Sequence, residues 1–209
     1  MLSLLPDLGE YNLYMVEAVE KEIAYIFGYG SLISSQSRKE TGITGKTFPC
    51  TYKGLRRSWS MGIDQFKAIA LNISEEKDSA CNGVLVEIAL SELPKFDQRE
   101  IGYKRIQLDP KSLMVEDVPL IELLKTRPVY AYVMNEQRTI PDDYKIQQSY
   151  VDVIITGCLE YGEDFTQNFV KTTSGWDQPW LMDRESPTYP RPLKGGYDKK
   201  LIDRLLACL

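Results

Sequence analysis

The chain contains no histidine among its 209 residues. This absence excludes Ser-His-Asp and Cys-His catalytic triads, and it excludes every metal site that depends on imidazole ligands. An enzyme with this sequence that works at neutral pH has to move protons with Asp, Glu, Lys, Tyr or Cys. Carboxylates are the leading candidates, provided that the fold raises the pKa of one of them.

Long apolar runs and dense basic clusters are missing as well. No stretch approaches the roughly 20 apolar residues that span a membrane. Pro6 and Asp7 interrupt the apolar start of the chain, which lacks the basic residues of a signal peptide. The net charge of −5 speaks against nucleic-acid binding, because phosphate contacts need grouped Lys and Arg. The densest basic stretch, residues 53–57, is interpreted as a solvated strand end.

Cysteine is scarce and widely spaced, at Cys50, Cys81, Cys158 and Cys208. Without a Cys-x-x-Cys pair, this spacing indicates reduced thiols rather than a disulfide framework or a zinc site. We therefore expect a cytoplasmic protein with no metal and with neither a membrane nor a nucleic acid as partner. No pattern in the sequence sets the oligomeric state.

Short β-branched or aromatic segments, separated by turn residues, predict a series of strands. They lie at 24–27, 47–52, 68–73, 83–88, 103–108 and 129–134. A helix is predicted over 91–101, with Ser91 as its N-cap and Gly102 as its stop. Further helices are predicted at 146–161, 163–172 and 199–209. Because helices interrupt the strands without regular alternation, we predict an α+β fold with a mostly antiparallel, barrel-like sheet.

The first predicted strand ends in a glycine turn, Phe27-Gly28-Tyr29-Gly30-Ser31-Leu32. Two glycines let the backbone turn sharply and approach a ligand closely. N–H groups at a helical start after such a turn suit a carboxylate or an oxyanion. Ile33 stands where a dinucleotide fingerprint needs its third glycine, and no Gly-Lys-Ser/Thr follows, so both nucleotide loops are excluded. An ordinary strand-to-helix turn is the alternative.

Glu100 falls on the apolar face of the predicted helix 91–101. Leu93 and Phe96 form the apolar stripe, and Glu100 follows Leu93 by seven residues on the same face, whereas Arg99 is predicted to point outward. A carboxylate on a buried face is costly unless it is paired or its pKa is raised. A raised pKa would let Glu100 both accept and donate a proton. The alternative is a glutamate that only pairs with a cation at the helix end.

Together, Tyr29-Gly30-Ser31-Leu32 and Arg99-Glu100-Ile101-Gly102-Tyr103 resemble motifs of the γ-glutamylcyclotransferase superfamily, most closely its ChaC-like branch. Tyr150-x-x-x-Ile154-Ile155-x-Gly157 is a weaker match, and the resemblance spans roughly residues 24–160. It implies a small mixed β-barrel surrounded by helices. It also implies release of 5-oxoproline from a small γ-glutamyl compound, with no metal and no organic cofactor.

The resemblance further implies roles for individual residues. Glu100 would be the catalytic acid and base. The substrate-binding residues that it implies are Tyr29, Gly30, Ser31, Leu32, Tyr103 and Tyr150. For Tyr103, aromatic core packing with a satisfied hydroxyl is an equally good interpretation. Glutathione, γ-glutamyl amino acids and γ-glutamyl amines on lysine compete as substrates, and the Arg99–Tyr103 context favours glutathione.

We predict three parts of the chain: an N-terminal extension over 1–21, a γ-glutamylcyclotransferase-like domain over 22–175, and an irregular segment with a C-terminal helix over 176–209, packed on the same domain. Two other functions stay open. One is a non-catalytic binding or regulatory protein of the same fold. The other is an unrelated interaction protein that docks through aromatic residues of its tail, Trp176, Trp180, Tyr189 and Tyr197.

Overall fold

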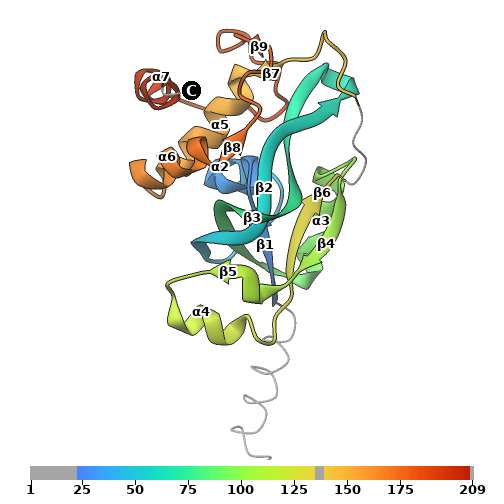
Figure 1. Ribbon diagram of the computed structural model, residues 1–209, viewed down its shortest axis with the longest axis vertical. Helices are drawn as coiled ribbons and strands as arrows, with labels where there is room; N and C mark the ends of the chain where they lie inside the picture. The colour runs from blue at the N-terminus through green and yellow to red at the C-terminus, as the bar shows by residue number, and fades with distance from the viewer. Residues whose placement is uncertain (1–22, 135–138, 208–209) are drawn as a thin grey trace, which may run out of the picture.

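The computed structural model describes residues 23–134 and 139–207. The predicted N-terminal extension and Cys208 lie outside the described residues. A seven-stranded sheet with the order β4-β6-β1-β3-β2-β5, and with β8 added to β2, forms the centre of the fold (Figure 1). Its strands are β1 (Ile23–Gly28), β2 (Thr47–Ile63), β3 (Ala68–Ala89), β4 (Lys104–Leu108), β5 (Leu113–Met114), β6 (Val129–Val133) and β8 (Thr173–Ser174). A separate pair joins β7 (Ile146–Gln147) to β9 (Trp180–Leu181).

The sheet is mixed and mostly antiparallel, as the sequence predicts, but it does not close into a barrel. Only the β1–β6 and β2–β8 pairings are parallel within it. Strands β4 and β5 lie at opposite ends of the strand order and do not pair with each other in the described part of the chain. The expected barrel is therefore wrong in its closure, since short edge strands end the sheet on both sides.

Strands β2 and β3 form one long hairpin, which the sequence reading divided into shorter pieces. The predicted strands 68–73 and 83–88 belong to the single strand β3. Residues 74–78 between them are polar and exposed, so their side-chain pattern hides the continuity of β3. Within this range Ser74 and Glu75 pair with Arg56 and Leu55 of β2. The basic stretch 53–57 lies in β2, and its prediction as a solvated strand end is wrong for Arg57, which is completely buried.

Six helices accompany the sheet in the described ranges: α2 (Ser35–Lys39), α3 (Leu93–Arg99), α4 (Val118–Leu123), α5 (Gln148–Leu159), α6 (Glu163–Lys171) and α7 (Lys199–Leu206). A 3-10 turn over Leu90–Glu92 precedes α3, so Glu92 and not Ser91 occupies the N-cap position. Helix α5 begins two residues later than predicted because Ile146 and Gln147 pair with β9. In Figure 1, α2, α5, α6 and α7 group together on one side of the β2–β3 hairpin, whereas α3 lies beside β4 and β6.

Helix α5 is the buried element on which the turn after β1 rests. Almost all of its residues are buried, and it packs on the 3-10 turn η1 (Ser31–Ile33). The contact is so close that a Cβ atom on Gly157 would lie 2.5 Å from the Cα atom of Ser34. The glycine in this weak third motif therefore has a packing role, because it lets α5 approach the backbone beside the glycine turn.

The aromatic tail packs against the domain. The indole N–H of Trp176 donates to the carbonyl of Val170 and that of Trp180 to the carbonyl of Trp176, each at 3.1 Å. The hydroxyl of Tyr197 donates to Asp152 at 2.7 Å. These contacts favour a structural role for the tail over a free docking surface.

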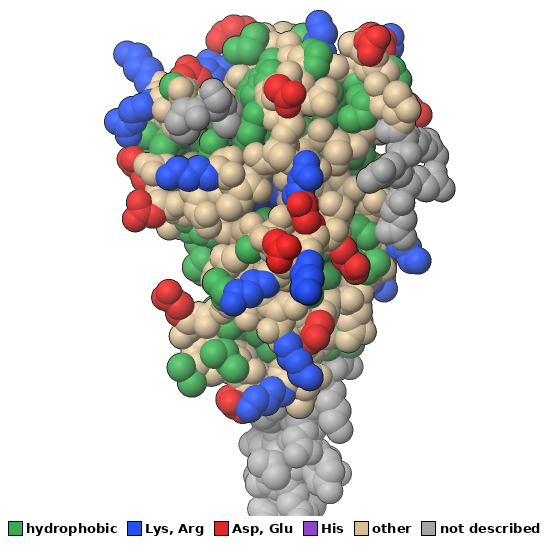
Figure 2. Space-filling view, in the orientation of Figure 1, with side chains coloured by type: hydrophobic (Ala, Val, Ile, Leu, Met, Phe, Trp, Pro, Cys, Tyr) green, Lys and Arg blue, Asp and Glu red, His purple; other side chains and the backbone are tan. Residues whose placement is uncertain are grey.

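The molecular surface carries charges of both signs. On the face shown in Figure 2, Lys and Arg side chains are interspersed with Asp and Glu side chains, without a broad patch of one sign. No helix in the described ranges has the length and apolar character needed to cross a membrane.

Candidate active site

The glycine turn after β1 is fixed by contacts on both sides. The buried Tyr29 hydroxyl donates to the carbonyl of Tyr132 at 2.5 Å. The Arg38 guanidinium donates to the carbonyls of Leu32 and Ile33 at 2.8 and 2.6 Å. A Cβ atom on Gly30 would lie 3.3 Å from the Tyr150 hydroxyl oxygen. Glycine at this position thus keeps open the space between the turn and α5.

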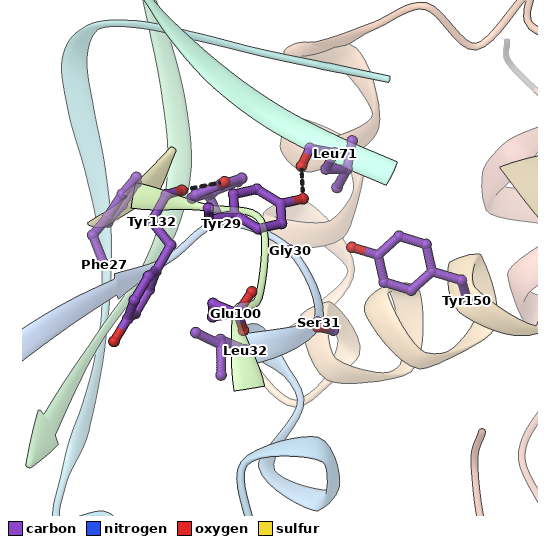
Figure 3. Close-up of a pocket in the computed structure, with 10 residues that line it drawn as sticks. Phe27, Tyr29, Gly30, Ser31, Leu32, Leu71, Glu100, Tyr132 and Tyr150 are labelled. Atoms are coloured by element: carbon purple, nitrogen blue, oxygen red, sulfur yellow. Dashed lines mark hydrogen bonds between the residues drawn. The ribbon is translucent and has the colours of Figure 1, made fainter. Parts of the chain in front are cut away.

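A small cavity of about 30 Å³ lies at this turn. Every site residue predicted from the sequence lines it: Tyr29, Gly30, Ser31, Leu32, Glu100, Tyr103 and Tyr150. The sequence reading missed three further lining residues, Phe27, Leu71 and Tyr132, which look like ordinary strand residues. In Figure 3, Glu100 lies beside the Gly30–Leu32 turn, and the Tyr150 side chain points into the same space from α5.

Glu100 occupies the C-terminal end of α3. Its backbone N–H donates to the carbonyl of Phe96 at 3.0 Å, and its side chain is 18% exposed. Burial raises the pKa of Glu100 above its usual 4.5, although the charges of Arg99 and Arg191 act in the opposite direction. A carboxyl group in this state is suited to take up and return a proton near neutral pH.

Arg99 connects Glu100 to the glycine turn, which corrects the prediction that it points outward. Its side chain is only 3% exposed. The guanidinium donates to Glu100 Oε1 at 3.0 Å and to Ser31 Oγ at 2.9 Å. It also donates to the carbonyl oxygen and the hydroxyl of Ser37, at 2.6 and 2.7 Å, and to the hydroxyl of Thr41.

All five N–H groups of a guanidinium can be used in such a network. The helical pattern could not reveal it, because Arg99 lies in the last turn of α3, where the side chain reaches back toward α2.

The two predicted pocket tyrosines differ in their surroundings. Tyr103 donates from its hydroxyl to the carbonyl of Leu71 at 2.8 Å, which satisfies it internally. Tyr150 packs edge-on against Trp59, with ring centres 5.6 Å apart, and lies 4.6 Å from the ring of Tyr189. Burial raises the pKa of both hydroxyls far above neutrality, so both tyrosines stay protonated. They can donate hydrogen bonds but cannot act as bases.

Metal ligation finds no support in the described ranges, where no group of three or more Cys, Asp and Glu side chains could hold a metal ion. The polar residues that line the cavity are Glu100, Ser31 and four tyrosines, and the Arg99 guanidinium bonds to the first two.

Comparison with solved structures identifies the fold. A structure described as a gamma-glutamyl cyclotransferase superimposes with a TM-score of 0.53, covering 88% of this chain and 98% of that one at 13% sequence identity. The chain has the γ-glutamylcyclotransferase-like fold. An uncharacterized protein from Homo sapiens shares this fold, with a TM-score of 0.51, 14% identity, and 88% and 98% of the two chains covered.

A further similar structure is YkqA from Bacillus subtilis, with a TM-score of 0.51 and 16% identity, covering 81% of this chain and 61% of that one. By sequence, no family model matches the chain, and no curated protein matches it significantly. The γ-glutamylcyclotransferase-like fold is thus recognised through its three-dimensional arrangement and the short motifs at the cavity.

Proposed function

We propose that this protein is a γ-glutamylcyclotransferase that releases 5-oxoproline from a small γ-glutamyl compound. One observation carries the proposal: a single guanidinium, that of Arg99, holds both the Glu100 carboxylate and the Ser31 hydroxyl at the rim of one cavity. The one carboxyl group among the described residues that line this cavity is thereby held next to the glycine turn. The γ-glutamylcyclotransferase-like fold supports the same reaction class.

The reaction itself is intramolecular. The α-amine of the glutamyl group attacks its own γ-carbonyl carbon, a C–N bond forms in a five-membered lactam, and the amide C–N bond to the leaving amine breaks. Holding the folded conformer is therefore the first task of the site, and good alignment contributes about 7–11 kcal/mol in the favourable limit. Backbone N–H groups of the Gly30–Leu32 turn are positioned to bind the glutamyl carboxylate or the developing oxyanion.

Glu100 moves the proton. The α-amine arrives as ammonium and cannot attack until it transfers a proton to the Glu100 carboxylate. The same carboxyl group then returns this proton to the departing nitrogen. Such general acid–base catalysis contributes roughly 10²–10⁴-fold, and the raised pKa of Glu100 reduces the energetic gap between its two protonation states.

The size of the cavity sets a condition on substrate binding. A volume of about 30 Å³ has room for one or two water molecules, whereas a γ-glutamyl group is several times larger. Binding therefore requires that side chains around the cavity move outward. Tyr150 lines the cavity, and the ring of Tyr189 packs on it at a tilt of 32°.

The decisive test is Glu100→Gln. We expect a loss of 5-oxoproline release of at least about 10²-fold, measured on a panel of γ-glutamyl compounds, because the amide cannot take up the proton. Glu122→Gln is a matched control, since this exposed glutamate in α4 pairs only with Lys125 on the surface. Turnover by Glu100→Gln at the rate of the wild type contradicts the proposed role.

The same variant separates loss of activity from loss of folding. Because the folded-state pKa of Glu100 is raised, ionisation of this group favours the unfolded state. Its contribution to stability is fully present below pH 4.5 and is lost as pH rises through the folded-state pKa. Glu100→Gln lacks this titration, so its stability should fall less than that of the wild type as pH rises from 4.5 to 7, measured by chemical denaturation.

The finer assignments remain predictions. Membership of the ChaC-like branch, the preference for glutathione, the cytoplasmic location and the division into three parts rest on the sequence alone. The non-catalytic alternative predicts that the wild type binds γ-glutamyl compounds at this cavity and releases no 5-oxoproline from any of them.

A further inference from the structure

The segment 183–194, which we name the crossing segment, makes contacts with both α5 and α2 and packs on Tyr150, a residue of the cavity lining. At one end, buried Asp183 accepts hydrogen bonds from the backbone N–H and the hydroxyl of Ser149, at 2.8 and 2.7 Å. At the other end, Pro192 accepts from the Gln36 side chain at 3.5 Å, and Lys194 pairs with Glu40 at 2.7 Å. The segment is therefore held against the domain at both ends.

Two residues of the crossing segment lie near the site between these ends. The Tyr189 ring packs on the ring of Tyr150, which lines the cavity. Arg191 follows two residues later, is half-buried, and lies close enough to Glu100 for the two charges to interact. In the sequence, Arg191 therefore lies between Tyr189, whose ring packs on Tyr150, and Pro192, which accepts a hydrogen bond from Gln36 of α2.

The other guanidiniums near the site are already occupied. Arg99 uses its donors on Glu100 and on oxygen atoms of Ser31, Ser37 and Thr41. Arg57 is completely buried and donates to protein oxygens through each of its three nitrogens. Arg191, in contrast, forms no ion pair within 4.0 Å with any residue in the described ranges.

The balance of charges near the cavity favours the binding of an anion. Glu100 carries one negative charge, while Arg99 and Arg191 carry two positive charges, so the site has an excess of one. A γ-glutamyl amino acid has a second carboxylate two bonds from the nitrogen that leaves. Glu100 must reach this nitrogen to return its proton, so a cation near Glu100 is suitably placed for that carboxylate.

We propose that Arg191 binds the carboxylate of the leaving amino acid, which makes γ-glutamyl α-amino acids the preferred substrates over γ-glutamyl amines that lack this group. The inference rests on the proposed function, because it assigns the leaving-group side of the same cavity. In glutathione the carboxylate lies one residue further along, so glutathione gains less from Arg191. On this point the proposal departs from the preference for glutathione that the Arg99–Tyr103 motif predicts.

Binding is measured best in a protein that does not turn the ligand over. In the Glu100→Gln background, isothermal titration compares γ-glutamyl-alanine with γ-glutamyl-alaninamide, which differ only in the carboxylate. We expect the acid to bind about 10- to 100-fold more tightly, as charge-assisted hydrogen bonds do. Adding Arg191→Gln should reduce this ratio to about one, whereas adding Lys194→Gln, which removes a charge from the outer end of the crossing segment, should leave it unchanged.

The outcomes distinguish the inference from the proposed function. Equal affinities for the acid and the amide overturn the role of Arg191. The same holds if the ratio of the two affinities persists in an Arg191→Gln variant whose melting temperature is unchanged. Steady-state kinetics of the protein with Glu100 intact provide the second measurement. If the wild type releases 5-oxoproline but shows the same kcat/KM for acid and amide, only the inference fails. If it releases none while the Arg191-dependent preference in binding persists, the proposed function fails and the carboxylate subsite stands.

Discussion

Replacing Arg99 should disturb stability and chemistry together, since one guanidinium connects α3, α2 and the glycine turn. Arg99→Met keeps much of the apolar side chain and removes all five hydrogen bonds. Arg99→Lys keeps the charge but replaces a planar fork with a single ammonium that has three donors. The pair of variants therefore separates the effect of charge from the effect of geometry.

The magnitude follows from the burial of the pair. Arg99 is 3% exposed and Glu100 18% exposed, so water replaces the lost partner poorly. Breaking a buried ion pair by removing one partner costs about 3–5 kcal/mol. At about 2–4 °C per kcal/mol for a chain of this size, Arg99→Met should lower the melting temperature by about 6–20 °C. Arg99→Lys should lose less, because the charge opposite Glu100 remains.

The pH dependence of kcat/KM distinguishes a role of Arg99 in the chemistry from a purely structural role, because a structural role would not change the pH profile. Activity requires ionised Glu100, and Arg99 lowers the pKa of that group. Arg99→Met should shift the rising limb of the profile to higher pH, and Arg99→Lys should shift it less. A melting temperature within 2 °C of the wild type for Arg99→Met, or an unmoved profile in a folded variant, refutes this reasoning.

Two more predictions concern the surroundings of the site. Gly157→Ala should destabilise the protein by about 1–3 kcal/mol or more in denaturant titrations, because the new Cβ would meet the Ser34 backbone at 2.5 Å. Gly196→Ala, at a position with no atom within 4 Å of a new Cβ, is its control and should change little. For Asp183, burial alone would raise the pKa, but hydrogen bonds from Thr188 and Ser149 outweigh it and hold the pKa below its usual 3.8. Its stabilising contribution is present above that value and is lost as pH falls through the folded-state pKa, so the stability difference between wild type and Asp183→Asn should shrink with acidification. A constant difference across the acidic range contradicts this account.

The candidate site was more accessible to sequence reasoning than the sheet was. Glu100 and the turn around Ser31 are local signals: a carboxylate on an apolar helical face and a glycine pair after a buried strand. Both signals depend on helical spacing and turn chemistry, which act over a few residues, although Glu100 follows α3 as its C-cap and does not lie within the helix. The structure shows that Glu100 and the turn around Ser31 line the same cavity, which no local sequence pattern could indicate.

Arg99 and the middle of β3 show why the rest could not be predicted. Helical periodicity assigns Arg99 to the outer face, but a long side chain in the last turn reaches partners that come from a different segment, α2. Residues 74–78 look like a loop because their side chains are polar, yet they belong to β3, and Ser74 and Glu75 pair with Arg56 and Leu55 of β2. In both cases the deciding partner lies far away in the sequence.

Arg191 was missed for a related reason. Its segment is rich in proline and has no periodic pattern, so nothing in the sequence indicates which of its side chains face the domain. The contacts of its neighbours, Tyr189 with Tyr150 and Pro192 with Gln36, place Arg191 near the cavity.

The buried guanidinium of Arg57 ties the cavity to the completion of the whole domain. It donates to the carbonyl of Asn82 in β3, to the carbonyl of Phe169 in α6 and to the hydroxyl of Thr173 in β8, and more weakly, at 3.5 Å, to the carbonyl of Tyr29 at the glycine turn. Burial lowers its pKa to about 10, so it stays charged at neutral pH, and within the described ranges no carboxylate pairs with it. A cation held only by neutral oxygens is stable when all of them are in place. A chain that ends before Phe169 would leave this buried charge without its partners in α6 and β8, next to the glycine turn of the candidate site.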